Sequence, residues 1–289
     1  MDTNTRARGC AIIVAGGSGT RFGNPGGKLL IDAAGKPLIT WTLEAFDAAS
    51  RVERIVVVCP PEKTDEMHRA AVAPFGFATP IAFAPSGAER QDSTRNGLDS
   101  VPTDCDIVLV HDAARPLILP ETIDAAIDAL VSADQAPAFG DPGGNVSGKR
   151  ELGADCALHG DAPSPTRCEG ASISSVSASD DLHALDGVVC GQPAVDTLKV
   201  IDAGGCFVET PSRAQFWTVQ TPQVFWADSL RRAYEWADRT GFVGTDDSSL
   251  VEGMGGRVRG FKAPRDNLKV TLPEDLAPVE AALHARLQG

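Results

Sequence analysis

The chain has 289 residues, of which 43% are hydrophobic and 22% are charged, as in a globular protein with a sizeable core. Its net charge of −13 argues against nucleic-acid binding, which needs a basic face. No apolar run reaches the ~20 residues that span a bilayer, and the first residues lack a signal-peptide core. We therefore expect a cytoplasmic protein without nucleic-acid or membrane partners, whose seven cysteines are free thiols.

Apolar β-branched runs alternate with helix-like segments through the first half of the chain. The expected strands are residues 10–15, 54–59, 79–84 and 107–111, and the expected helices are 37–49, 60–73, 90–100 and 120–131. This alternation predicts an α/β fold with a doubly wound, mostly parallel sheet. In such sheets ligands collect at the carboxyl ends of the strands.

Residues 133–186 interrupt the pattern, because they are rich in Ala, Gly, Ser, Pro and Asp and almost lack bulky apolar side chains. Such a composition predicts a low-complexity, disordered insertion at the amino edge of the sheet. The spacing of Cys156, His159, Cys168 and His183 matches no familiar zinc module, so we expect no protein metal site. The whole chain, 1–289, is predicted to form a single domain that carries this insertion.

Order resumes at residue 187 with a strand over 187–193. Two short strands at 198–201 and 206–208 flank a turn at 202–205, which predicts a β-arm over 195–213. The last expected elements are helices at 226–239, 246–254 and 273–287 and a strand at 256–261.

Residues 11–28 carry the strongest chemical signal. A strand-like run ends in Gly16, Gly17 and Gly19, and Arg21 and Lys28 follow. Glycines let backbone amides approach a phosphate, and the two cations supply full positive charge. The loop fits neither the Walker pattern nor the dinucleotide fingerprint, because Phe22 stands where each requires a glycine. An ordinary βα turn is the plain alternative.

The pattern Ala-Gly-Gly-Ser-Gly-Thr-Arg-Phe-Gly at 15–23 resembles the loop of nucleotidyltransferases that join a nucleoside triphosphate to a sugar or polyol phosphate. Six further segments follow in the order of one family. They are PSGAERQDS at 85–93, VHDAARP at 110–116, DTLK at 196–199, TPQVF at 221–225, TDD at 245–247 and DNLKVT at 266–271. Together they resemble the methylerythritol phosphate cytidylyltransferases of the non-mevalonate isoprenoid pathway. The resemblance covers nearly the whole chain except residues 133–186.

The resemblance implies a Rossmann-like nucleotidyltransferase fold and transfer from CTP to a polyol phosphate, with release of pyrophosphate. Nucleotidyl transfer is an in-line displacement at phosphorus, so cations matter more than a protein nucleophile. By resemblance, Arg21 and Lys28 hold the triphosphate and Lys269 stabilises the α-phosphorus. The implied nucleotide-binding residues are Ala15, Gly16, Gly17, Gly19, Gly87 and Ser93. Mg²⁺ is the implied cofactor, held mainly by phosphates.

The acceptor residues are also implied by the resemblance. Asp112 binds the acceptor hydroxyls and Arg115 its phosphate, while Thr197 and Thr221 supply hydrogen bonds. Arg213 enters the neighbouring subunit's site, so we expect a homodimer formed through the arm at 195–213. Ala88 stands where family members often have Asp, which leaves base preference open.

Two alternatives stay open at this point. A ribitol phosphate cytidylyltransferase would share the loop, the DAARP turn and the terminal lysine. A non-catalytic nucleotide-binding regulator would be expected to have lost Arg21, Lys28 or Lys269, and all three are present. His111 is interpreted as a packing residue at a strand end rather than as a general acid or base.

Overall fold

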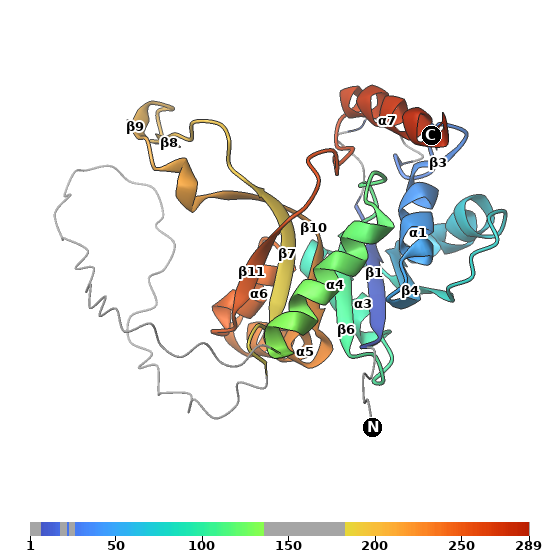
Figure 1. Ribbon diagram of the computed structural model, residues 1–289, viewed down its shortest axis with the longest axis horizontal. Coiled ribbons are helices and arrows are strands. Elements are labelled where there is room, and N and C mark those ends of the chain that lie inside the picture. Colours follow the sequence, from blue (N-terminus) through green and yellow to red (C-terminus); the bar gives the residue numbers. More distant parts are fainter. Residues whose placement is uncertain (1–6, 18–21, 23–26, 136–182, 289) are drawn as a thin grey trace.

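A seven-stranded sheet forms the centre of the molecule in the computed structural model (Figure 1), which describes residues 7–17, 22, 27–135 and 183–288. The strand order is β11-β7-β10-β6-β1-β4-β5. The strands are β1 (Gly9–Val14), β4 (Val52–Cys59), β5 (Ile81–Pro85), β6 (Ile107–Asp112), β7 (Gly187–Pro193), β10 (Trp217–Trp226) and β11 (Val258–Lys262). Only β10 runs antiparallel to its neighbours in this sheet. The predicted α/β fold with a mostly parallel sheet is confirmed.

The winding of the chain sets where a ligand can bind. From β1 the chain proceeds outward to β4 and β5, and then returns to the other side of β1 to form β6. The direction of winding therefore reverses between β1 and β6. At such a switch point the loops diverge at the carboxyl edge and leave a crevice.

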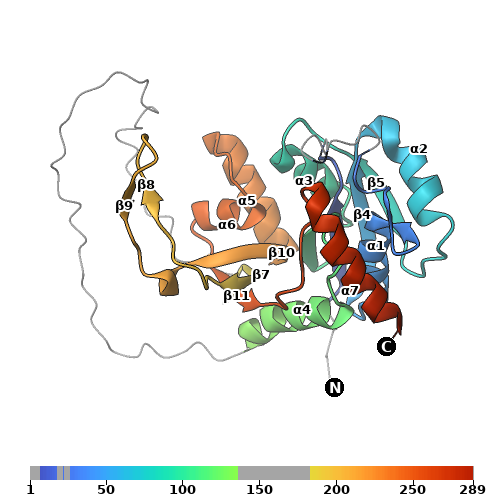
Figure 2. The same ribbon diagram turned by 90° about the horizontal axis from the view of Figure 1, so that it is seen from above.

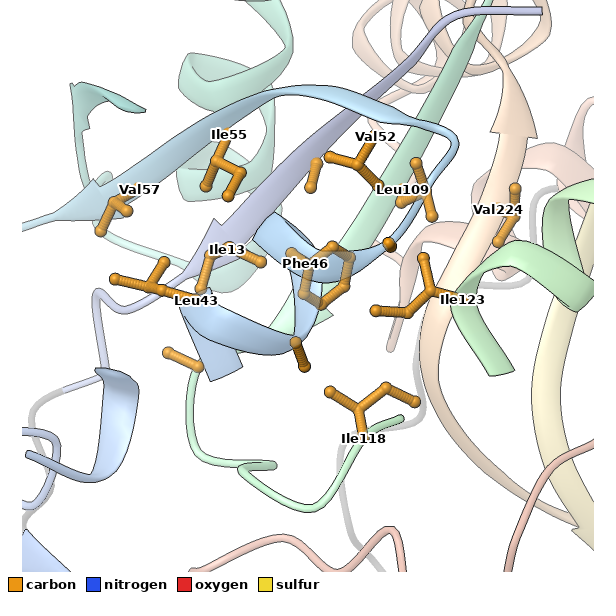
Figure 3. Packing of buried hydrophobic residues seen from close by; sticks show 14 of the residues in the cluster. Ile13, Leu43, Phe46, Val52, Ile55, Val57, Leu109, Ile118, Ile123 and Val224 are labelled. Carbon is orange, nitrogen blue, oxygen red and sulfur yellow. The ribbon is translucent and has the colours of Figure 1, made fainter. Parts of the chain in front are cut away.

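Helices cover both faces of the sheet, as Figure 2 shows from above. The described helices are α1 (Leu38–Ala48), α2 (Thr64–Met67), α3 (Arg90–Asp99), α4 (Pro120–Gln135), α5 (Ala227–Thr240), α6 (Asp247–Gly253) and α7 (Leu276–Gln288). Helices α1 and α4 cover one face, where Phe46 packs against Ile13 and Leu109 (Figure 3). Helices α3 and α5 cover the other face, where Ile12 packs against Leu98 and Leu230 in a second hydrophobic core. Successive residues of β1 thus enter different cores, as the two-residue period of a strand requires.

The short strands lie outside the main sheet. A two-residue pair, β2 (Asp32–Ala33) and β3 (Lys36–Pro37), precedes α1. The expected arm is formed by β8 (Val200–Ile201) and β9 (Phe207–Glu209), which pair antiparallel and project away from the main sheet (Figure 2). Strand β8 is shorter than the expected 198–201, whereas β9 has the expected length but is shifted by one residue from 206–208.

Strand β10 was not expected, because Pro222 interrupts its apolar run. Proline lacks the amide hydrogen that a ladder needs. The ladder between β10 and β7 accordingly skips from Val219 to Gln223, across a cis peptide bond between Thr221 and Pro222. The strand continues on either side of this break. After the break, residues 223–225 of β10 pair with both β7 and β6.

Three helix bounds also differ from expectation. The segment expected as one helix at 60–73 is a 3₁₀ turn at Pro61–Lys63, then α2 and a π turn at His68–Val72. Residues 273–275 form a 3₁₀ turn ahead of α7. Helix α4 extends through Gln135, so 133–135 belong to the helix rather than to the insertion. Residues 183–186 are also described, and there the Asp186 carboxylate accepts a hydrogen bond from the Arg257 amide at 2.8 Å. The insertion expected at 133–186 is therefore shorter at both ends, and the expectation of disorder for its remaining part, 136–182, lies outside the described residues.

Candidate active site

A pocket of about 390 Å³ opens at the carboxyl ends of β1 and β6, at the switch point of the sheet. The loop after β5 and the segment after β11 complete its wall. Among the expected site residues, those that line it are Ala15, Gly16, Gly17, Lys28, Gly87, Ser93, Asp112 and Lys269. Segments far apart in sequence thus converge where the fold predicts a ligand.

Within the described ranges, no helix is long and apolar enough to cross a membrane.

Glycine is needed at different positions of the pocket for different physical reasons. A Cβ at Gly16 would lie 2.6 Å from the Ser86 Cβ, and one at Gly87 would lie 2.2 Å from the Asp92 Cβ. Gly16 therefore lets the loop after β1 approach the loop after β5, and Gly87 lets that second loop fold closely against the start of α3. Among the described residues, a Cβ at Gly17 would meet no atom within 4 Å. Its backbone faces open space in which a ligand can lie.

The loop that forms one pocket wall is held rigidly by its own hydrogen bonds. The Ser93 hydroxyl accepts a hydrogen bond from the Gly87 amide at 3.0 Å and donates one to the Glu89 carbonyl at 3.0 Å. Glu89 caps α3, and its amide donates to the Asp92 carboxylate at 3.0 Å. Ser93 is nearly fully buried, so its hydroxyl orders the loop that lines the pocket.

Cations gather around one carboxylate at the opposite wall. The Lys269 ammonium lies 2.8 Å from Asp112 Oδ2, and Arg115 Nε lies 3.4 Å from the same oxygen. Burial alone would raise the pKa of Asp112, but Lys269, Arg115 and Arg90 lower it to about 2. Asp112 is therefore ionised at neutral pH. The Lys28 ammonium donates to the Val270 carbonyl at 2.5 Å, which brings both lysines to one segment.

Thr221 connects β10 to this carboxylate from behind. Its hydroxyl accepts a hydrogen bond from the Asp112 amide at 3.0 Å and lies 3.1 Å from His111 Nδ1. His111 is fully buried, and burial lowers its pKa to about 3. The neutral ring fits a hydroxyl that donates to Nδ1, with Nε2 facing the Arg115 carbonyl at 3.4 Å. His111 therefore packs and orders Thr221, as expected.

Comparison with known proteins shows which family the chain belongs to. The model of the 2-C-methyl-D-erythritol 4-phosphate cytidylyltransferase family matches residues 10–140 and 161–285. The chain belongs to this family. It is accordingly an enzyme, a CTP-dependent nucleotidyltransferase of isoprenoid biosynthesis. The residues that the family model leaves between its two matched parts are 141–160, inside the predicted insertion.

Individual relatives agree with this assignment. A 2-C-methyl-D-erythritol 4-phosphate cytidylyltransferase of Caldanaerobacter subterraneus is 32% identical over 94% of this chain and 97% of its own. One of a Synechococcus species is 33% identical over 95% and 99%. The crystal structure of 4-diphosphocytidyl-2C-methyl-D-erythritol synthase from Anaerococcus prevotii superposes with a TM-score of 0.70 at 22% identity, covering 97% of each chain. That structure supports the fold.

Not every expected site residue of the family lines the pocket. Arg115 and Thr221 are not among its lining residues, and the Arg115 guanidinium donates to the Asn267 carbonyl at 2.9 Å. Thr197 and Arg213 are exposed on the arm, where the Arg213 guanidinium donates to the Val195 carbonyl at 2.5 Å. Gly19 and Arg21 lie outside the described residues.

Sequence reasoning missed Arg90, which also lines the pocket. Its guanidinium lies 2.8 Å from the carboxylate of Asp247, a residue 1% exposed that also accepts a hydrogen bond from the Tyr234 hydroxyl at 2.7 Å. Burial acts to lower the pKa of Arg90, but the Asp247 charge raises it overall. Both residues stand in quoted motifs, yet only the fold brings α3 and α6 together.

Proposed function

We propose that this chain transfers the cytidylyl group of CTP to 2-C-methyl-D-erythritol 4-phosphate and releases pyrophosphate. The observation that carries the proposal is the convergence of Lys28, Lys269 and Asp112 on one pocket at the switch point, in a chain of this family. We place the reaction in the cytoplasm. The free, buried cysteines Cys10 and Cys190 suit a reducing compartment.

The chemistry requires positioning and charge neutralisation. A phosphate oxygen of the acceptor attacks the α-phosphorus of CTP, the bond from that phosphorus to the bridging oxygen of the β-phosphate breaks, and pyrophosphate leaves. Lys28 and Arg21 hold the triphosphate in this proposal, and Lys269 faces the α-phosphorus. Such cations stabilise negative charge that develops at phosphorus without any proton transfer. The amides of Gly16 and Gly17 provide further donors beside them.

Nucleotide and acceptor occupy different walls in the proposal. Ala15, Gly19, Gly87 and Ser93 form the cytidine side. Asp112, ionised at neutral pH, accepts hydrogen bonds from the acceptor hydroxyls, and Thr221 holds Asp112 in place. Arg115 lies within 3.4 Å of Asp112, where a guanidinium can bind the acceptor phosphate after a side-chain rotation.

A second copy of the chain completes the acceptor side. Thr197 and Arg213 lie on the arm and do not line this chain's own pocket. The arm exposes Phe207 by 72% and Ile201 by 60% of their surfaces, and clustered apolar side chains of this kind mark association surfaces. We propose a homodimer in which each arm carries Arg213 toward the partner subunit's acceptor phosphate.

The donor set of the pocket fits Mg²⁺ that is bound mainly through substrate phosphates. Asp112 and Glu89 are the carboxylates that line it, and Mg²⁺ commonly takes one or two carboxylates together with phosphate oxygens and water. When bound, the ion would neutralise the pyrophosphate leaving group. Asp112 lies 2.8 Å from Lys269, which would share this task.

A pyrophosphate-release assay tests the proposal directly. The purified chain is incubated with CTP, UTP or ATP and with methylerythritol phosphate or ribitol phosphate. We expect release with CTP and methylerythritol phosphate; UTP turnover would show that Ala88 relaxes base choice. Faster turnover of ribitol phosphate would favour that alternative. CTP binding without any turnover would overturn the proposal and favour a regulator.

A further inference from the structure

The segment that carries Lys269 has no regular secondary structure to fix it. After β11, at the far edge of the sheet, the chain crosses the ends of β7 and β10 before Lys269 reaches the pocket beside β6. The position of the lysine therefore depends on individual contacts. One of them is the hydrogen bond from the Val270 amide to the Ala114 carbonyl at 2.9 Å.

Asn267, two residues before the lysine, supplies the contacts on the other side. Its side-chain amide nitrogen donates to the Thr221 carbonyl at 2.8 Å and to Gln220 Oε1 at 3.3 Å. Both partners are acceptors, so the amide nitrogen rather than the oxygen must face them. Asn267 is 1% exposed, and within the described part of the chain its Oδ1 has no hydrogen-bond partner. The residue tolerates a buried unpaired oxygen, which is costly, while its nitrogen uses both hydrogens.

These contacts close a ring around the lysine. Thr221 accepts from Asn267 through its carbonyl and from the Asp112 amide through its hydroxyl. The Asp112 carboxylate in turn holds the Lys269 ammonium at 2.8 Å. The Asn267 side chain and the tip of the Lys269 side chain thus contact two residues, Thr221 and Asp112, that are hydrogen-bonded to each other.

We propose that Asn267 is the positioning residue of Lys269. It sets how far the ammonium reaches into the pocket, and it touches neither substrate. The inference rests on the proposed role of Lys269 at the α-phosphorus. A small displacement of a reacting group can reduce turnover about 100-fold, so loss of the amide should reduce kcat rather than CTP affinity.

The test is a double-mutant cycle with Asn267→Ala and Lys269→Ala, measured as kcat and as KM for CTP. We expect Asn267→Ala to lower kcat by about 10- to 100-fold with little change in KM, and to have little further effect in the Lys269→Ala background. Asn267→Ser keeps one donor and should fall between wild type and Asn267→Ala. The matched control is Asn96→Ala, which removes an exposed amide that donates to the Pro85 carbonyl and should leave kcat unchanged.

Two results would overturn the proposal. One is a full additional loss in the Lys269→Ala background, which would mean that Asn267 acts through the fold at large. The other is a crystal structure of Asn267→Ala or Asn267→Ser in which Lys269 still lies 2.8 Å from Asp112. The second result does not depend on activity, so it separates failure of this inference from failure of the proposed function. Thermal unfolding of each variant identifies any that does not fold, and the other then carries the test.

Discussion

Adjacent residues at the end of β6 perform opposite tasks. His111 points into the core, where its ring packs 5.0 Å from that of Phe46, while Asp112 faces the pocket and its cations. Successive side chains of a strand point to opposite faces, which explains this division. A His-Asp pair is common in acid-base chemistry, but here the pleat of the strand points the two side chains to opposite faces. Only Asp112 remains charged and accessible to substrate.

The buried His111 predicts a specific pH dependence of stability. Its pKa falls from 6.5 to about 3 on folding, so between these values the unfolded chain binds a proton that the folded chain does not. The free energy of unfolding should therefore fall as pH drops through this window, by up to about 1.4 kcal/mol per unit. His111→Gln should remove that part of the slope. Urea unfolding between pH 6.5 and 4.5 measures it, above the range in which Asp112 titrates.

The control for this prediction is His284→Gln on α7, where the side chain is exposed. This variant should keep the wild-type slope. If His111→Gln also keeps that slope, then His111 takes up its proton in the folded chain. The neutral ring assigned to it would then be wrong.

At the scale of elements, regular periodicity was predictive and long-range pairing was not. Strands β1 and β6 and helix α4 were expected within a few residues, because unbroken apolar patterns mark them. Strand β10 was missed, because Pro222 breaks its pattern. The roles of Arg90 and Asn267 depend on Asp247 and Thr221, which only the folded chain brings near them. A local pattern reports which face a residue occupies, but not its distant partner.

The arm yields a prediction about assembly. Phe207→Asp places a charge in the apolar surface of β8 and β9, where Phe207 is 72% exposed. If this surface packs against a second copy, the charge must be desolvated and the dimer should dissociate. Light scattering should then give the mass of one chain for the variant and of two for wild type. Glu209→Gln, on the same strand, should remain a dimer; a dimeric Phe207→Asp would exclude this interface.

Arg213 yields a separate prediction about substrate affinity. In the proposed dimer, Arg213→Ala removes a charge-assisted hydrogen bond to the acceptor phosphate, worth about 1.5–3 kcal/mol. The KM for methylerythritol phosphate should therefore rise about 10- to 100-fold, while the KM for CTP stays nearly constant. Arg213→Lys should retain part of the affinity, and Arg239→Ala, at the exposed end of α5, serves as the control. An equal rise in both KM values would contradict the assigned role.

On the scale of the whole molecule, topology concentrates charge that composition hides. The chain carries a net charge of −13, yet Lys28, Arg90 and Lys269 line one pocket. They come from separate parts of the chain, and the switch point between β1 and β6 brings them together. A local cluster of cations in a cleft can attract a polyphosphate despite the overall sign. The net charge therefore describes the surface as a whole, whereas the order of the strands determines where the cations of the site come together.

The same topology predicts that residues 141–160, which the family model leaves unmatched, are dispensable for turnover. Helix α4 ends at Gln135 and β7 begins at Gly187, both at the amino edge of the sheet, whereas the pocket lies at the carboxyl edge. Deletion of 141–160 should leave kcat and both KM values within about twofold, because the described residues on either side of it lie away from the pocket. A Gly/Ser linker of equal length in the same place controls for spacing. Loss of activity in both variants would mean that this segment contributes to the site, and loss in the deletion alone would mean that its length is required.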